Sequence, residues 1–222
     1  KGFLDALRQH LSDFLIGLLE RSDRVAGSDY YNVALGIGEQ RSLYRKHQLV
    51  PFGEYLPLAP LLGWLLDYLN IPMSDFSAGP DQQAPLVLAG QQIGVSICYE
   101  DAFAARINTA LPDATILANL SEDAWFGDSL APHQRLQMAR ARALETGRPM
   151  IRSSNNGLSS LIGPDGAVKA LAPQFETAVV RGRVQPMTGV TPAVRYGNLP
   201  VGLGCLFLLG IGLWQRKVAI GH

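Results

Sequence analysis

The first apolar pattern of the chain repeats at helical spacing between residues 3 and 19. Apolar positions three and four apart share one face of a helix, so this pattern predicts an amphipathic helix that packs one side on a core. The positions that carry the pattern are Phe3, Leu4, Leu7, Leu11, Phe14, Leu15, Leu18 and Leu19. A strand is predicted next, from Tyr31 to Ile37, where Gly38 ends it.

The rest of the chain up to residue 197 alternates short strands with one clear helix. Residues 134–146 are rich in good helix formers and precede Gly147 and Pro149, which predicts a helix that stops there. Strands are predicted at residues 86–89, 93–98, 115–119, 150–153, 158–162, 167–170 and 177–184. This alternation predicts an α/β fold in a single domain that covers residues 1–197.

The tail of the chain has a different pattern, because residues 199–214 carry no charge. Taken alone, this run fits either a buried core helix or a membrane helix. Trp214 at its edge and the basic pair Arg216-Lys217 after it favour the membrane. We therefore expect a transmembrane helix at residues 198–217, with residues 218–222 in the cytoplasm and the domain on the other side.

Charge and cysteine content narrow the function classes. The 222 residues include 19 basic and 19 acidic side chains, and this balance, without a long basic run, argues against a general nucleic-acid binder. Two cysteines, Cys98 and Cys205, exclude a disulfide scaffold and a cysteine-rich zinc module. The chain starts at Lys1 without a signal peptide pattern, and we expect the native start to lie upstream.

Cys98 is the first candidate for chemistry. It ends a predicted buried strand, where a cysteine is usually an inert packing residue. Here the strand opens into the polar residues Tyr99, Glu100 and Asp101. A nucleophilic thiol needs a nearby base or cation, and Lys46, in a polar run before a Pro-Gly loop, is the candidate cation. Spacing alone leaves the alternative of a solvated lysine open.

Five motifs bring these residues together: YRKHQLVPFGEY, ICYED, SEDAWFG, RSSNNG and IGPDG. In their residues and their order, these motifs resemble those of the nitrilase superfamily, and most closely those of its membrane-bound branch, the apolipoprotein N-acyltransferases. The resemblance covers roughly residues 30–215. It implies an αββα sandwich followed by a transmembrane helix, a Glu-Lys-Cys triad, and neither a cofactor nor a metal.

Six positions match residues that this family uses at its site. They are the family lysine, a second glutamate in its loop, the nucleophile, the two residues after it and the tryptophan of the DAWFG turn: Lys46, Glu54, Cys98, Tyr99, Glu100 and Trp125. The family's first glutamate follows a proline well upstream of the lysine. Glu20, in the predicted helix, and Glu39, after Gly38, do not fit it. We expect this glutamate to precede Lys1 and the chain to be inactive by itself.

The resemblance implies an N-acyltransferase of the bacterial inner membrane, with its catalytic domain in the periplasm. It would move an acyl chain from a phospholipid through a Cys98 thioester to the α-amino group of a lipoprotein's diacylglyceryl cysteine. The apolar segment from Tyr55 to Phe76 would then line an acyl path or rest on the bilayer, or else form a core helix. Two other functions stay open: a nitrilase-type amidase, and a catalytically incomplete tail-anchored binding module.

Overall fold

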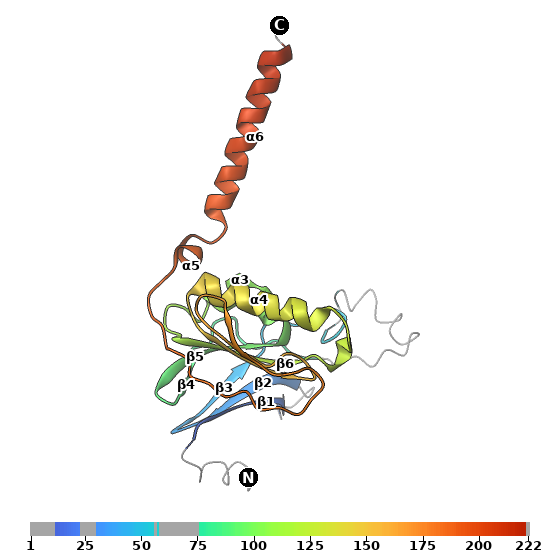
Figure 1. The fold of residues 1–222 in the computed structure, drawn as a ribbon, viewed down its shortest axis with the longest axis vertical. Helices are drawn as coiled ribbons and strands as arrows, with labels where there is room; N and C mark the ends of the chain where they lie inside the picture. Colours follow the sequence, from blue (N-terminus) through green and yellow to red (C-terminus); the bar gives the residue numbers. More distant parts are fainter. Residues whose placement is uncertain (1–11, 23–29, 56, 58–75, 221–222) are drawn as a thin grey trace, which may run out of the picture.

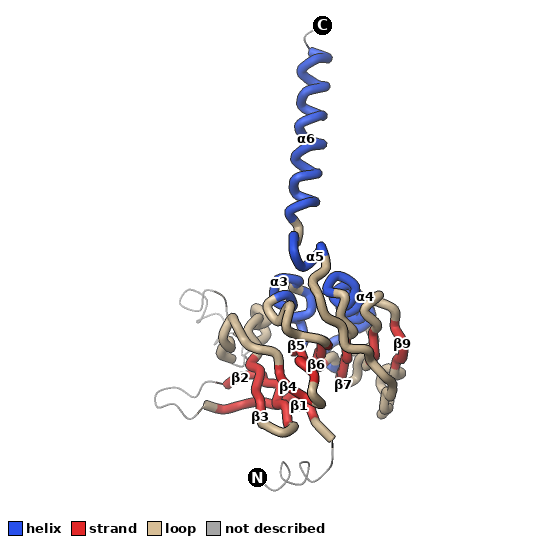
Figure 2. Tube along the Cα trace, turned by 90° about the vertical axis from the view of Figure 1, so that its left-hand side faces the viewer, coloured by secondary structure: helices blue, strands red, loops and turns tan. Residues whose placement is uncertain are grey.

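Two β-sheets stacked face to face form the body of the molecule, and a long helix projects from it (Figures 1 and 2). The computed structural model describes residues 12–22, 30–55, 57 and 76–220. The apolar stretch at residues 58–69 lies outside these ranges, as does most of the segment from Tyr55 to Phe76. The α/β class predicted from the sequence is confirmed.

The smaller sheet contains three antiparallel strands, which are β1 (Phe14–Arg21), β2 (Tyr30–Ile37) and β3 (Arg41–Arg45). The helix predicted for residues 3–19 is wrong where it overlaps β1, and residues 3–11 lie outside the described ranges. A short apolar run with a glycine, Gly17, suits a strand as well as a helix. Pairing with β2 along the whole of β1, from Phe14 to Arg21, decides the outcome.

The larger sheet holds six strands in chain order, and every strand predicted between residues 86 and 170 is confirmed in it. They are β4 (Leu86–Leu88), β5 (Gln91–Ile97), β6 (Ile116–Glu122), β7 (Met150–Asn155), β8 (Ser160–Ile162) and β9 (Val168–Leu171). The three central strands, β5, β6 and β7, run parallel, and the outer ones are antiparallel. The carboxyl ends of the parallel strands therefore share one edge of the sheet.

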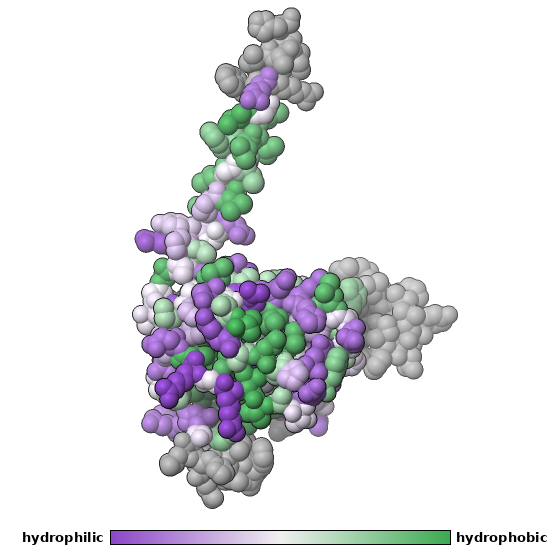
Figure 3. Space-filling view, in the orientation of Figure 1, coloured by the Kyte–Doolittle hydropathy of each residue, from purple (hydrophilic) through white to green (hydrophobic). Residues whose placement is uncertain are grey.

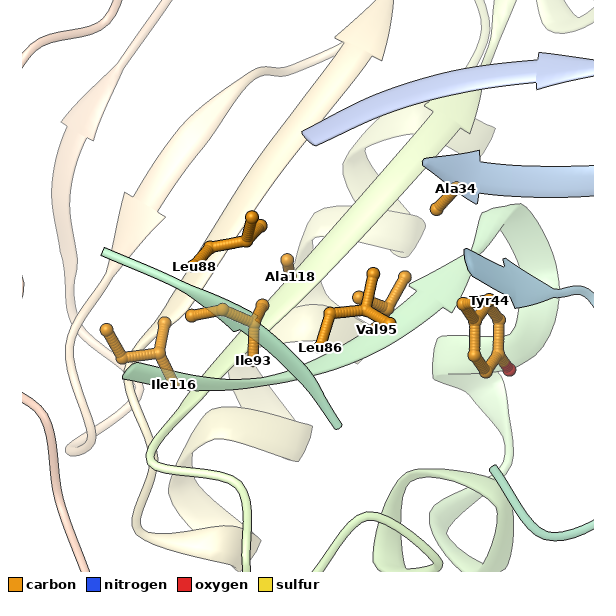
Figure 4. Close-up of a cluster of buried hydrophobic side chains, with 8 residues drawn as sticks. All are labelled: Ala34, Tyr44, Leu86, Leu88, Ile93, Val95, Ile116 and Ala118. Atoms are coloured by element: carbon orange, nitrogen blue, oxygen red, sulfur yellow. The ribbon is translucent and has the colours of Figure 1, made fainter. Parts of the chain in front are cut away.

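Apolar side chains fill the space between the two sheets (Figure 4). They are Ala34 and Tyr44 from the smaller sheet and Leu86, Leu88, Ile93, Val95, Ile116 and Ala118 from the larger one. A second cluster lies between the larger sheet and the helices α3 (Ala104–Asn108) and α4 (Ala131–Thr146). In the described ranges, helices cover only the larger sheet, so three of the four layers of the predicted αββα sandwich are seen.

A long segment without strands, residues 172–191, leads from β9 to the C-terminal helices. The strand predicted at residues 177–184 is therefore wrong. This segment crosses the larger sheet instead of extending its edge, and Gly182 lies directly over Leu161. Strand-forming residues thus remain without a ladder partner, because tertiary context outweighs their propensity.

Buried Arg148 holds the end of this segment. Its guanidinium donates to the carbonyl of Gly189 at 2.7 Å and to that of Ala114 at 2.7 Å. Two further carbonyls, of Thr146 and Pro112, lie at 3.4 Å from it. The side chain of Thr191 also hydrogen bonds to the carbonyl of Glu145. The chain therefore leaves the domain from a fixed point.

The chain then forms α5 (Pro192–Tyr196) and α6 (Leu199–Ile220), so the helix predicted in the tail exists. Apolar side chains surround α6 and are exposed along it (Figure 3). Within the part of the chain that the structure describes, however, no helix has both the length and the apolar character to cross a membrane, in contrast to the span predicted at residues 198–217. The apolar run at residues 199–214 is shorter than the roughly 20 apolar residues that a span requires.

Candidate active site

Cys98 begins a short 3-10 helix, η1 (Cys98–Ala102), directly after β5. Its backbone has a φ of +52°, a left-handed conformation that typically costs a residue other than glycine about 1–3 kcal/mol. Buried Asn119, on the neighbouring strand β6, supports this turn by donating from Nδ2 to the Cys98 carbonyl at 3.1 Å. The half-buried thiol thus stands at the carboxyl edge of the parallel strands, in a position for which the fold accepts strain.

Lys46 follows β3 and is almost completely buried, with 1% of its surface exposed. Its Nζ donates to Glu54 Oε2 at 2.6 Å. The same oxygen accepts the backbone N–H of Val50 at 2.8 Å, and Asn32 donates to the other carboxylate oxygen. Glu54 therefore supplies the counter-charge that a buried ammonium needs. The two residues that the family resemblance assigned to one loop, Lys46 and Glu54, are therefore in direct contact.

Glu100 joins the lysine loop to the turn that carries Cys98. It is fully buried and accepts four hydrogen bonds within 3.0 Å. The donors are the Tyr44 hydroxyl and the backbone N–H groups of His47, Gln48 and Ile97. Burial, and next the Glu100 carboxylate, raise the pKa of Tyr44 far above its usual range, so this hydroxyl remains a donor. Glu100 therefore fixes residues 47–48 relative to η1.

Replacing Glu100 by glutamine should test this link. The amide nitrogen of glutamine would face at least one of these donors, and we expect a loss of about 2–3 kcal/mol in the free energy of unfolding. Glu145→Gln is a matched control, since Glu145 makes a partly exposed ion pair with Arg142 and should cost at most about 0.5 kcal/mol. Urea unfolding measures both values. Equal effects of the two variants would contradict the link.

The aromatic residues predicted at the site are largely exposed. Trp125 lies in η2 (Ala124–Phe126), after β6, and 89% of its surface is exposed. Tyr99 packs edge-on against Phe103, with ring centroids 5.1 Å apart. Phe126 is also exposed. These rings come from the turns after β5 and β6 and offer apolar surface on the same edge of the sheet as Cys98.

Sequence reasoning missed a buried group of charges beside Cys98, which is called here the arginine–aspartate cluster and consists of Asp101, Asp123, Arg135 and Arg152. Arg152 donates to Asp101 Oδ2 and to Asp123 Oδ2, both at 3.0 Å. Arg135, on α4, lies 3.3 Å from Asp101 Oδ1 and 3.5 Å from Asp123 Oδ1. Its Nη1 also contacts Cys98 Sγ at 3.5 Å.

One signal in the sequence pointed to part of this cluster. Asp101 follows β5 and Asp123 follows β6, and parallel strands bring such positions to one edge. The two carboxyl groups differ in their surroundings. Burial raises the pKa of Asp101, although both arginines oppose this shift. Burial acts in the same direction on Asp123, but the hydrogen bond from Ser154 and the charge of Arg152 outweigh it and lower its pKa.

Of the two glutamates upstream of Lys46, Glu20 lies in a different element from the one predicted. Glu20 lies on strand β1 and not in a helix, and its two carboxylate oxygens pair with Arg45 at 2.6 and 2.7 Å. This pairing holds the pKa of Glu20 below its usual value. Glu39 lies in the exposed turn between β2 and β3. Among the described side chains, no group of three histidine, cysteine, aspartate or glutamate residues could hold a metal ion.

Comparison with known sequences connects this geometry to a family. A family model described as carbon-nitrogen hydrolase matches residues 1–192. An apolipoprotein N-acyltransferase of Nitrosomonas europaea is 48% identical over 206 residues, which cover 91% of this chain and 41% of that protein. The enzyme of the same name from Methylococcus capsulatus is 46% identical over 211 residues, covering 95% and 41%. The chain thus spans about two fifths of the length of these relatives.

Solved structures share the fold at low sequence identity. A carbon-nitrogen hydrolase of Helicobacter pylori superimposes with a TM-score of 0.56 at 18% identity, over 77% of this chain and 61% of that one. An amidase from Nesterenkonia sp. gives a TM-score of 0.56 at 19% identity, over 79% and 62%. At this level of identity the similarity supports the nitrilase-like fold alone.

Proposed function

We propose an acyl-transfer function from one premise: the chain belongs to the carbon-nitrogen hydrolase family, whose model matches residues 1–192. Its relatives named apolipoprotein N-acyltransferases indicate an N-acyltransferase within that family. We assign Cys98 as the nucleophile and Lys46 as the electrophilic partner. The observation that carries this assignment is the link through Glu100, which ties the strained turn of Cys98 to the loop of the buried lysine.

In the proposed reaction, the Cys98 sulfur attacks the ester carbonyl of a phospholipid. A carbon–sulfur bond forms, and the lysophospholipid leaves as an alcohol after taking up a proton. The amine of a lipoprotein's diacylglyceryl cysteine then attacks the thioester, an amide forms, and the thiol is released. The Lys46 ammonium would stabilise the oxyanion in both steps, a contribution of about 3–4 kcal/mol for a preorganised donor. The proton carrier would be the first glutamate of the family's triad.

The two glutamates of this chain would support the site rather than carry protons. Glu54 binds the lysine ammonium directly and would hold its Nζ in place. Glu100 already accepts four hydrogen bonds and is fully buried, so it would set the spacing between the lysine loop and Cys98. Tyr99 and Trp125 would offer exposed apolar surface to an acyl chain. This arrangement would also limit access of water to the thioester.

Helix α6 supports a place for the protein at a lipid surface, which we propose to be the bacterial inner membrane. Its large apolar side chains are exposed from Leu199 to Leu213. Exposed apolar surface of this extent is unfavourable in water and marks an interaction with lipid or protein. Contact between α6 and lipid would hold the domain close to a phospholipid donor.

The test is a mass measurement on the full-length protein incubated with a phospholipid. We expect one acyl chain on the peptide that contains Cys98, removal of this adduct by hydroxylamine, and its loss when a diacylglyceryl peptide amine is added. Hydrolysis of a small amide without any acyl adduct would overturn the proposal in favour of an amidase. Neither adduct nor hydrolysis would favour a binding module.

A further inference from the structure

Cys98 contacts a cation other than Lys46. The guanidinium of Arg135 places Nη1 at 3.5 Å from Cys98 Sγ, whereas Lys46 Nζ is bound to Glu54. We propose that Arg135 is a further catalytic residue, which holds the Cys98 sulfur as a thiolate and orients it for attack. This inference rests on the proposed role of Cys98 as nucleophile. It divides the work between two cations, because Lys46 then serves the oxyanion and Arg135 serves the sulfur.

The position of Arg135 is fixed from two sides. Nη2 donates to Asp101 Oδ1 at 3.3 Å, and Nε lies 3.5 Å from Asp123 Oδ1. Asp101 belongs to η1, beside the nucleophile, and Asp123 follows β6. A planar guanidinium held by two carboxylates has little freedom to rotate, so its remaining nitrogen is directed at the sulfur.

The incomplete hydrogen bonding of buried Arg135 favours an anionic partner. Only 6% of its surface is exposed, and its Nε has no hydrogen-bond partner among the described groups. A neutral thiol is a weak acceptor, so a buried guanidinium that faces one loses solvation without adequate compensation. A thiolate is a strong acceptor for the same N–H group. The buried, incompletely bonded arginine therefore fits a negative sulfur better than a neutral one.

Every charged group of the arginine–aspartate cluster enters this balance. Arg135 comes from α4, Arg152 from β7, Asp101 from η1, and Asp123 from the end of β6. Arg152 donates to Oδ2 of both aspartates and to Oδ1 of Asn119. It thereby neutralises part of their charge, which leaves Arg135 more available to the sulfur.

The test follows the alkylation of Cys98 by iodoacetamide in the full-length protein between about pH 5 and 9, read by mass on the Cys98 peptide. In a Cys205→Ser background, the exposed second cysteine does not interfere. We expect Arg135→Gln to slow alkylation at neutral pH by about tenfold or more and to move the pH profile upward. Arg135→Lys should retain part of the rate. Arg140→Gln is the control, because Arg140 lies on the same helix and donates to the Gly166 carbonyl.

An unchanged pH profile in folded Arg135→Gln would overturn the inference. A second measurement does not depend on the folding of any arginine variant: thiolate absorbance at neutral pH, taken as the difference between the protein and its Cys98→Ala variant. We expect a thiolate signal, and its absence would also overturn the inference. Neither assay needs phospholipid, so a failure of the proposed acyl transfer remains distinguishable from a failure of Arg135.

Discussion

Cys98→Ala in the full-length protein is expected to abolish acyl transfer, because it removes the sulfur that would form the thioester. Removal of the nucleophile from a well-studied hydrolase costs about a million-fold in kcat, and a loss of that order is expected here. Lys46→Met should retain the nucleophile and lower the rate of adduct formation by about 10²–10³-fold, the typical cost of one lost oxyanion donor. The measurement is single-turnover formation of the Cys98 adduct from phospholipid.

The two variants are expected to differ in whether the Cys98 adduct accumulates. Cys98→Ala should show no adduct at any time, whereas Lys46→Met should accumulate the same adduct slowly. Circular dichroism and the unfolding midpoint must first show that both variants fold, because Lys46 is buried against Glu54. Normal turnover by folded Cys98→Ala would contradict the mechanism. An unchanged rate of adduct formation in Lys46→Met would show that the lysine has no role in the mechanism.

Arg152→Met is expected to lower the free energy of unfolding by about 3–5 kcal/mol, the cost of breaking a buried ion pair by removing one partner. Arg152 is 2% exposed and binds Asp101, Asp123 and Asn119, so the substitution leaves two buried carboxylates with one arginine. Lys169→Met is the control, since its exposed pair with Asp165 is worth at most about 1 kcal/mol. Urea unfolding at neutral pH gives both values.

Acid should reduce the difference between Arg152→Met and the unchanged protein. Asp123 has a lowered pKa in the folded state, so its contribution is present above the ordinary value of 3.8 and is lost as the pH falls through the lowered value. Arg152 supplies part of that lowering. A loss in Arg152→Met that is as small as that in Lys169→Met would show that the cluster is not a structural centre.

The parts of this site that the sequence predicts are those that depend on short stretches of chain. Lys46 and Glu54 lie within one loop, and Cys98 ends a strand whose apolar run is unambiguous. The contact between Arg135 and Cys98 could not be predicted in the same way. It depends on how α4 packs over the larger sheet, where Ala139 and Ala143 allow close approach. No local pattern of residues 131–146 distinguishes Arg135 from Arg140 and Arg142 on the same helix.

The same reasoning explains the errors in the fold. Residues 14–21 form a strand because β2 is available to pair with them along their length. Residues 177–184 have a similar composition, yet they pass over the sheet and pair with no strand. Both segments contain apolar and β-branched residues, but only the positions of distant strands decide between a ladder and an unpaired segment.

The hydrogen bond from Arg148 to the Gly189 carbonyl limits the distance between the domain and α6. Between Gly189 and Leu199, even a fully extended chain would measure only about 35 Å, and the short helix α5 makes this connection shorter still. The surface that binds α6 therefore limits the distance from that surface at which Cys98 can react. A substrate must therefore reach Cys98 within that distance, because the segment that connects Gly189 to α6 is short.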